Sequence, residues 1–327
     1  RYKILEIIDD NKRKEYLNAI NNVYKHGRFI LGPEIDELEE NLSEITKRKH
    51  CITVSNGTMS LIISLLAMKK KYPNKREVIL PSYGWIASAQ AILHAGLTPV
   101  FADITNQLFI DTKTTEELIN ESTLGIMVVD FSGRIGSNIH ELVKLSVHFN
   151  IPIIEDCAQA FGAWNSSNNN KVFYSAGSIG EVSCLSINPM KTLASHGEGG
   201  AILTDDDDVA SFARRFRYQG MEGGEIKEFG INARMETLQA SITLVNLSKY
   251  EQIIDKKRSI AKFYDEKLSK YVETPKEDKL EQHTFFSYQI LTKERDNLKF
   301  FLEERNIESQ IQHYRLSIHH SQLLSSL

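Results

Sequence analysis

Cysteine is scarce in this sequence, and long apolar runs are absent from it. The three cysteines, Cys51, Cys157 and Cys184, show no metal-ligand spacing and each lies in or beside an apolar strand-like run. This predicts buried, reduced thiols in a cytoplasmic protein. The longest apolar run, residues 61–68, is far shorter than the roughly 20 residues that span a bilayer. With no signal peptide evident either, we expect no membrane association.

Neither an excess of charge nor a dinucleotide motif is present. The 327 residues carry a formal net charge of -4, which argues against a nucleic-acid partner. No G-x-G-x-x-G follows the first predicted strand, so a Rossmann site is disfavoured. The length predicts one large domain with a smaller one, or two domains. Because the chain begins at Arg1 rather than at methionine, we expect further residues before it.

Short apolar segments alternate with helical patterns from Cys51 onward. The strand-like segments are residues 51–54, 76–81, 97–104, 124–131 and 151–156, and a helical stretch follows each of the first four. This alternation predicts an α/β fold with a mostly parallel sheet flanked by helices. Two helices are expected before it, one over residues 11–26 and one beginning after Gly32-Pro33.

The pattern changes after residue 208. A helix over 209–218 and a glycine-rich loop over 220–230 precede a long helix predicted from about Glu236 to Tyr271. A strand over 285–291, a helix over 295–306 and a strand over 308–314 are expected to follow. We therefore expect a large domain over residues 1–240, and a linking helix with a small α+β domain over residues 241–327.

Two segments contain groups that could bind an anionic ligand. Residues 55–58 join the first strand to a helix; their backbone N–H groups could bind a phosphate, or Ser55 or Asn56 could simply cap the helix. Lys191 lies in SINPMKTLASHGEGG, residues 186–200, between an apolar run and a glycine cluster. Held between buried strands, it would have a lowered pKa and act as an amine nucleophile. The alternative is a surface lysine beside a glycine turn.

Three further residues follow strand-like segments, where parallel α/β sheets bind ligands. Asp156 ends the segment 151–156 and could bind a protonated ring nitrogen or only cap the next element. Gln159 follows it, and Trp85 opens the helix after residues 76–81, as a core residue or as a plate for a flat ligand. A phosphate cup, an aromatic plate, a carboxylate and a lysine are together the groups that pyridoxal phosphate needs.

Six segments resemble, in the same order, those of the DegT/StrS nucleotide-sugar aminotransferases, which are fold-type I pyridoxal phosphate enzymes. They are GRFILGPEIDELE, SNGTMSL, PSYGWIASAQAI, IEDCAQAFGA, SINPMKTLASHGEGGAILTDD and FGINARMETLQA, and the match covers roughly residues 28–319. The resemblance implies the fold-type I aminotransferase fold. It also implies that the C-terminal domain is incomplete, because in the family this domain continues beyond the corresponding end.

The resemblance assigns roles residue by residue. Lys191 would bind the cofactor covalently as a Schiff base and shuttle a proton, and Asp156 would keep the pyridine nitrogen protonated. The other implied cofactor contacts are Trp85 on the ring face, Gln159 at the ring edge, Gly57, Thr58 and Ser186 on the phosphate, and Asn232 on the phosphate of the partner subunit's cofactor in a homodimer. His313, Tyr314 and His319 would lie near the sugar. No motif assigns a task to His196 or implies a metal.

The implied activity is transamination of a nucleotide-linked keto-sugar by an amino acid, glutamate in the family, for surface polysaccharide or glycan biosynthesis. Three alternatives stay open. A related dehydratase would use pyridoxamine phosphate, but such enzymes typically have histidine where this chain has Lys191. A regulator would bind the cofactor without turnover. A plain α/β protein would bind some other phosphorylated ligand.

Overall fold

A seven-stranded sheet forms the centre of the computed structural model, which describes residues 8–166 and 172–312. The strand order is β1-β9-β8-β5-β4-β2-β3. Six strands run parallel and β9 is antiparallel to both of its neighbours, which confirms the predicted mostly parallel sheet. The strands are β1 (His50–Val54), β2 (Glu77–Pro81), β3 (Thr98–Ala102), β4 (Thr123–Val129), β5 (Ile153–Asp156), β8 (Val182–Ser186) and β9 (Gly200–Thr204).

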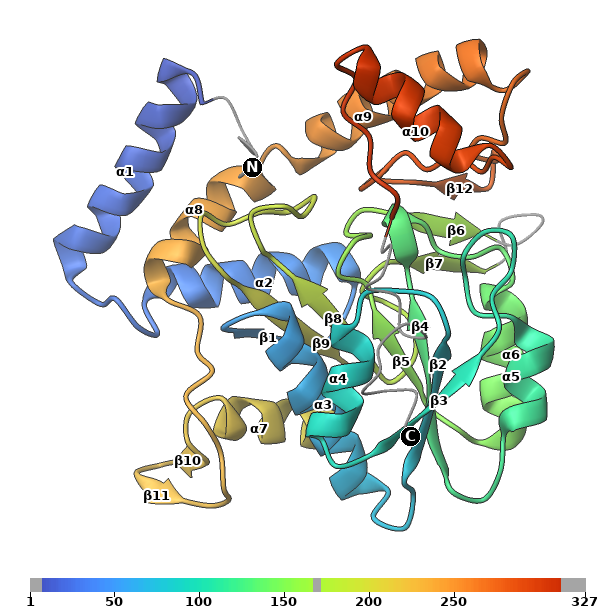
Figure 1. Ribbon diagram of the computed structural model, residues 1–327. Coiled ribbons are helices and arrows are strands. Elements are labelled where there is room, and N and C mark those ends of the chain that lie inside the picture. Colours follow the sequence, from blue (N-terminus) through green and yellow to red (C-terminus); the bar gives the residue numbers. More distant parts are fainter. Residues whose placement is uncertain (1–7, 167–171, 313–327) are drawn as a thin grey trace.

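Helices cover both faces of this sheet (Figure 1). One buried apolar cluster includes side chains of α2 (Pro33–Thr46), α6 (Ile139–Phe149) and α8 (Thr237–Leu247). The other includes side chains of α3 (Gly57–Lys71), α4 (Ala87–His94) and α7 (Asp207–Phe216). Within β2, Ile79 belongs to the first cluster while Val78 and Leu80 belong to the second. Alternation along the strands thus supplies two cores, one on each face.

The remaining elements lie around this three-layer body. Helix α1 (Asp10–His26) packs on α8, and α5 (Thr112–Leu118) packs on α6 and β3. A second sheet, in the order β12-β6-β7, joins the C-terminal part of the chain to the large domain. Figure 1 shows α9, α10 and β12 gathered above the large sheet. The bounds are β6 (Trp164–Ser166), β7 (Phe173–Ser175), β10 (Met221–Glu222), β11 (Glu225–Ile226), α9 (Tyr250–Leu268), β12 (Glu281–Gln282) and α10 (Arg295–Glu304).

Two predicted elements differ in the structure. The helix expected over 236–271 is two helices, α8 and α9, separated at Ser248 and Lys249. The Ser248 hydroxyl donates to the carbonyl of Val245 at 2.8 Å, a local bond of the kind that competes with helix continuation. Residues 285–291 are not a strand: one bridge joins Leu291 to Glu273, and Phe285 has a φ of 44°. The domain boundary near residue 240 stays a prediction.

The helix expected over 295–306 is confirmed as α10. Residues 307–312 lie outside helices and strands, and the rest of the strand expected over 308–314 lies outside the described residues. Among the helices that the structure describes, none is long and apolar enough to span a lipid bilayer.

A buried ion network anchors α2 and α7 to β1. Glu39 Oε1 accepts hydrogen bonds from the Thr53 amide at 2.8 Å and from Arg217 at 2.5 Å, while Oε2 accepts from Arg214 at 2.8 Å. Burial alone would raise the pKa of Glu39, but the two guanidinium groups hold it below its ordinary value of 4.5. The carboxylate therefore stays ionised when buried, with its oxygen atoms paired.

Replacing Glu39 with glutamine should lower the free energy of unfolding by about 3–5 kcal/mol, because Arg217 would stay buried without its anion. The pKa of Glu39 is lowered on folding, so its contribution is present above pH 4.5 and is lost as the pH falls through the folded-state pKa. Urea unfolding at pH 7 and below pH 4.5 should therefore show a variant deficit that shrinks in acid. Glu40→Gln, an exposed neighbour on the same helix, is the control; equal losses for both variants would contradict the assignment.

Candidate functional site

The predicted site residues follow strands whose carboxyl ends share one edge of the large sheet. Since β1, β2, β5 and β8 are mutually parallel, residues 55–58, 82–88, 156–159 and 186–191 all begin at that edge. This is where open α/β sheets bind ligands. The sheet therefore brings four separate sequence segments to one place.

A narrow cradle forms where α3 begins. A Cβ atom on Gly57 would lie only 2.6 Å from the Cβ of Ser186, so glycine allows the first turn of α3 to approach the end of β8. The amides of Gly57 and Thr58 lie in that first turn, where N–H groups have no carbonyl partner within the helix. Asn56 caps α3 by accepting from the Met59 amide at 2.9 Å. The capping interpretation is thus correct for Asn56, and the first-turn amides remain suited to a phosphate.

Asp156 is a buried carboxylate fixed by two hydrogen bonds. Ser88 donates from its hydroxyl to Oδ2 at 2.7 Å, and the Ala158 amide donates to Oδ1 at 3.2 Å. Burial raises the pKa of Asp156 above its ordinary value, opposed by these two bonds and by the charge of Lys191. The carboxylate therefore has a fixed orientation and interacts electrostatically with Lys191.

Lys191 lies in the loop between β8 and β9, with its amine largely buried. Its Nζ atom lies 5.0 Å from the centre of the Phe286 ring. Burial lowers the pKa of Lys191, opposed by the negative charges of Asp156 and Glu198. A lowered pKa increases the neutral, nucleophilic fraction of the amine at neutral pH. This environment favours the predicted reactive amine over an ordinary surface lysine.

Trp85 and Gln159 take different positions at this edge. Trp85 precedes α4 and is 48% exposed, so the alternative of a core residue is wrong. Gln159 is buried. Its side-chain Oε1 accepts from the Ser132 amide at 2.8 Å, and its backbone carbonyl accepts from the Thr284 hydroxyl at 3.2 Å. These bonds orient Gln159 from η1 (Phe131–Gly133) and from the C-terminal part of the chain.

Asn232 is exposed and lies on the segment after β11. Its Oδ1 accepts from Arg234 Nε at 3.0 Å, and its backbone forms a bridge with Tyr218. The next residue, Ala233, accepts a hydrogen bond from the Ser55 amide at 2.8 Å, so the segment that carries Asn232 runs beside residues 55–58 of its own chain. His313, Tyr314 and His319 lie outside the described residues.

The sequence did not reveal Ser88, Ser132 or Phe286 as site residues. Ser88 stands three residues after Trp85, a spacing that places two residues on one face of a helix, so periodicity could have suggested it. Ser132 acts through its amide and has a φ of 60°, which no side-chain pattern indicates. Phe286 reaches Lys191 only through the folding of a segment that had been expected to form a strand.

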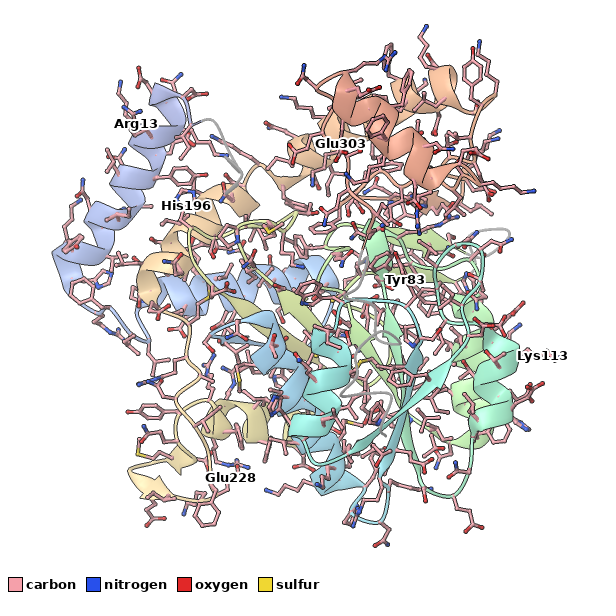
Figure 2. The ribbon with its side chains drawn as sticks, in the orientation of Figure 1. Arg13, Tyr83, Lys113, His196, Glu228 and Glu303 are labelled. Carbon is pink, nitrogen blue, oxygen red and sulfur yellow. The ribbon has the colours of Figure 1, made fainter. Side chains whose placement is uncertain are left out.

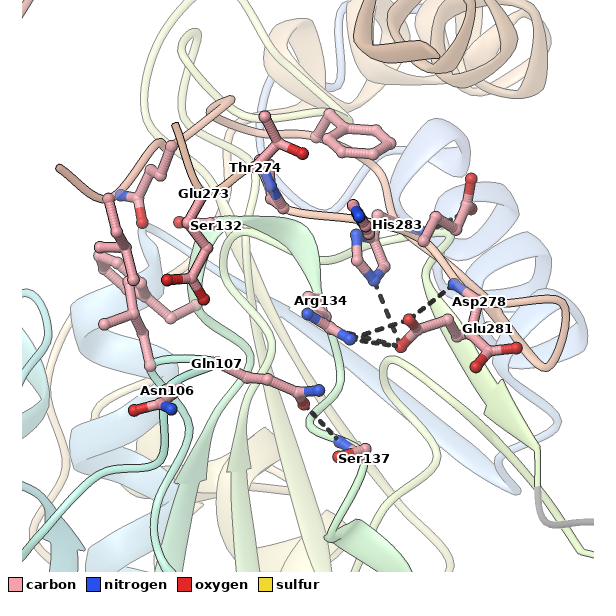
Figure 3. Close-up of a pocket in the computed structure, with 18 of the residues that line it drawn as sticks. Asn106, Gln107, Ser132, Arg134, Ser137, Glu273, Thr274, Asp278, Glu281 and His283 are labelled. Atoms are coloured by element: carbon pink, nitrogen blue, oxygen red, sulfur yellow. Dashed lines mark hydrogen bonds and ion pairs between the residues drawn. The ribbon is translucent and has the colours of Figure 1, made fainter. Parts of the chain in front are cut away.

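A cavity of about 1940 Å³ lies beside this edge, between segments from 131–144 and 269–294. Figure 3 shows Arg134, Glu281 and His283 pointing toward one another at its border, where Arg134 Nη2 donates to Glu281 Oε1 at 2.8 Å. Ser132 lines the cavity and contacts Gln159, whereas Lys191 and Asp156 do not line it. The cavity therefore adjoins the Lys191 site, but neither the Lys191 amine nor the Asp156 carboxylate lines it.

The residues at the sheet edge fit pyridoxal phosphate. The cradle beside Gly57, too narrow for a Cβ, presents amides and the Ser186 hydroxyl to an anion. The buried carboxylate of Asp156 suits a protonated ring nitrogen, and the amine of Lys191 suits a carbonyl carbon. In the part of the chain that the structure describes, no cluster of three potential metal-ligating side chains is present.

Known proteins resemble this chain over most of its length. A UDP-2-acetamido-2-deoxy-3-oxo-D-glucuronate aminotransferase of Pseudomonas aeruginosa is 30% identical over 309 residues, covering 93% of this chain and 83% of that protein. A pleiotropic regulatory protein of Geobacillus stearothermophilus is 30% identical over 321 residues, covering 96% and 84%. The crystal structure of S. venezuelae DesV in complex with a ketimine intermediate superposes with a TM-score of 0.88 at 25% identity, covering 97% and 84%.

A model of the DegT/DnrJ/EryC1/StrS aminotransferase family matches residues 10–326. This match spans every segment on which the resemblance was based, including the cradle, Asp156 and Lys191. The chain therefore belongs to the DegT/DnrJ/EryC1/StrS aminotransferase family, whose cofactor is pyridoxal phosphate.

Proposed function

We propose that this protein transfers an amino group from an amino acid, glutamate as expected for the family, to a keto group of a nucleotide-linked sugar. The observation that carries the proposal is the buried amine of Lys191 within electrostatic reach of the buried Asp156, beside an anion cradle. The Pseudomonas relative, an aminotransferase named for a UDP-linked 3-oxo sugar, supports the substrate class. The product would be an amino-sugar nucleotide for surface polysaccharide or glycan biosynthesis.

Different side chains would bind the cofactor and move the proton. Bound pyridoxal phosphate supplies an aldehyde carbon that bonds to amines and a ring that accepts an electron pair. Lys191 would bind it covalently as a Schiff base, and Nζ, once free, would take a proton from the α-carbon of the donor. Asp156, oriented by Ser88, would hold a proton on the ring nitrogen. Gly57, Thr58 and Ser186 would bind the phosphate, Trp85 would cover the ring face, and Gln159 would contact its edge.

The active unit in this proposal is a homodimer with shared sites. Asn232 is exposed, as expected if it contacts the phosphate bound by the partner subunit. His313, Tyr314 and His319 are proposed near the sugar. Three free, buried cysteines support the expected reducing, cytoplasmic compartment.

A cofactor-binding regulator is the second candidate, favoured by the name of the Geobacillus relative. A regulator needs cofactor binding but not proton transfer. The lowered pKa of Lys191 would aid cofactor binding in either case, whereas the fixed orientation of Asp156 would serve turnover. We therefore place transamination first, and the test below distinguishes the two functions.

Incubation with glutamate and a panel of nucleotide-linked 3-keto and 4-keto sugars should give an amino sugar, detected by mass spectrometry as nitrogen from ¹⁵N-glutamate. Lys191→Ala should abolish transfer, because it removes the amine proposed to bind the cofactor and move the proton. A protein that binds pyridoxal phosphate but never converts it to the amine form with any amino donor would be a regulator instead.

Replacing Ser88 with alanine should raise the pKa of Asp156, because the Ser88 hydrogen bond favours the ionised form. The acid limb of the kcat/KM profile should therefore move to higher pH, while activity at higher pH falls little. Asp156→Asn should reduce kcat/KM about a hundredfold at all pH values, as loss of a charge-assisted bond predicts. An unchanged acid limb in Ser88→Ala would contradict the role given to this pair.

Mixed dimers test the shared site. If Lys191 of one chain works with Asn232 of the other, a dimer of one Lys191→Ala and one Asn232→Ala chain has one native site and one doubly altered site. About half of its sites should then bind pyridoxal phosphate with native affinity. If Asn232 acts within its own chain, both sites are defective and none should.

A further inference from the structure

The loop that carries Lys191, residues 187–199, is closed by its own backbone. The Ile187 amide donates to the Gly199 carbonyl at 2.7 Å, and the Ser195 amide donates to the Ile187 carbonyl at 3.0 Å. The buried Ser195 hydroxyl donates to the same carbonyl at 2.7 Å. These bonds join the two ends of the Lys191 loop, but they do not fix its position relative to the helices around it.

Two side chains from outside the Lys191 loop provide that fixation. Asn246, on α8, donates from Nδ2 to the carbonyl of Ala194 at 2.7 Å. Ala194 lies in the loop, three residues after Lys191. The hydroxyl of Tyr16, on α1, donates to Asn246 Oδ1 at 2.6 Å. The Tyr16 ring also contacts His196, with centroids 4.4 Å apart. Figure 2 shows His196 between α1 and α8.

Both side chains are buried, Tyr16 at 4% and Asn246 at 5% exposure. A buried amide is costly unless its donor and its acceptor are both bonded, and asparagine is a poor helix former. Asn246 meets this requirement because its Oδ1 accepts from Tyr16 and its Nδ2 donates to the Lys191 loop. On α8 it stands near Leu247, Ala240 and Ile242, all buried apolar residues. A leucine could occupy this position in the core, but it could not bind the loop.

Helix α8 supports the Lys191 loop at a second point. A Cβ atom on Gly197 would lie 2.8 Å from Gln239 Nε2, so the backbone of the loop rests against the helix there. Asn246 and Gln239 therefore contact the loop on either side of His196. The loop is thus held against one rigid element rather than suspended between strands.

We infer that Tyr16 and Asn246 are positioning residues for Lys191: their hydrogen-bond relay from α1 through α8 to the Ala194 carbonyl fixes the Lys191 loop. The inference rests on the proposed function in taking Lys191 as the reacting amine. The order of the loop itself can be measured without cofactor. The relay also assigns a role in positioning Lys191 to α1, which lies outside the sheet.

Hydrogen exchange of the cofactor-free protein tests the relay. Asn246→Leu should raise the exchange rate of amides in residues 188–197 about five- to tenfold, as loss of one buried hydrogen bond predicts. Tyr16→Phe, which keeps the ring against His196, should raise it by a smaller factor. Exchange in the strands of the sheet should not change. Tyr24→Phe, the same chemical change at an exposed tyrosine of α1, is the matched control.

The rate of covalent capture of pyridoxal phosphate by Lys191 gives a second readout. Asn246→Leu should slow capture about tenfold, because the amine spends less time in the reactive position. Unchanged loop exchange and an unchanged capture rate in both relay variants would overturn the inference. Failure of the unaltered protein to form the covalent bond at Lys191 would instead overturn the proposed function. If Asn246→Leu fails to fold, Tyr16→Phe alone decides between these outcomes.

Discussion

The proposed active site depends on two ionisable groups, the buried Asp156 and the largely buried Lys191, which lie beside the same edge of one sheet. Burial raises the pKa of Asp156 and lowers the pKa of Lys191, which favours the neutral form of each group. The charge of each group opposes the pKa shift of the other. Such a pair is stable only where the surroundings supply hydrogen bonds and a fixed geometry. Parallel strands β5 and β8 deliver the two residues to one edge, and the helices around them provide the rest.

Those surroundings come from distant parts of the chain. Ser88 orients the carboxylate from α4, while Phe286 lies over the amine from the C-terminal segment. Asn246 and Tyr16 hold the Lys191 loop from α8 and α1. The large sheet therefore does not form this site alone, because Asp156 and Lys191 each also have a contact from outside it.

Much of this arrangement could be predicted from the sequence. The strand pattern predicted a parallel sheet, and since the ends of parallel strands meet at one edge, Gly57, Asp156 and Lys191 were expected to converge. Ser88 and Asn246 were not, because their roles depend on which face of a helix meets the site. The apolar content of residues 285–291 led to a wrong strand prediction. The segment turns at Phe285 and packs on η1, where the Ser287 hydroxyl donates to the Ser132 hydroxyl at 3.2 Å.

The central claim is that Lys191 is a buried amine with a lowered pKa that bonds to the cofactor. The most direct test is borohydride reduction of the protein with pyridoxal phosphate across a pH series, followed by peptide mass spectrometry. The account predicts one labelled peptide, containing Lys191, with labelling half-maximal below the ordinary lysine pKa of 10.5. Label on a different lysine, or undiminished labelling of Lys191→Arg, would contradict it.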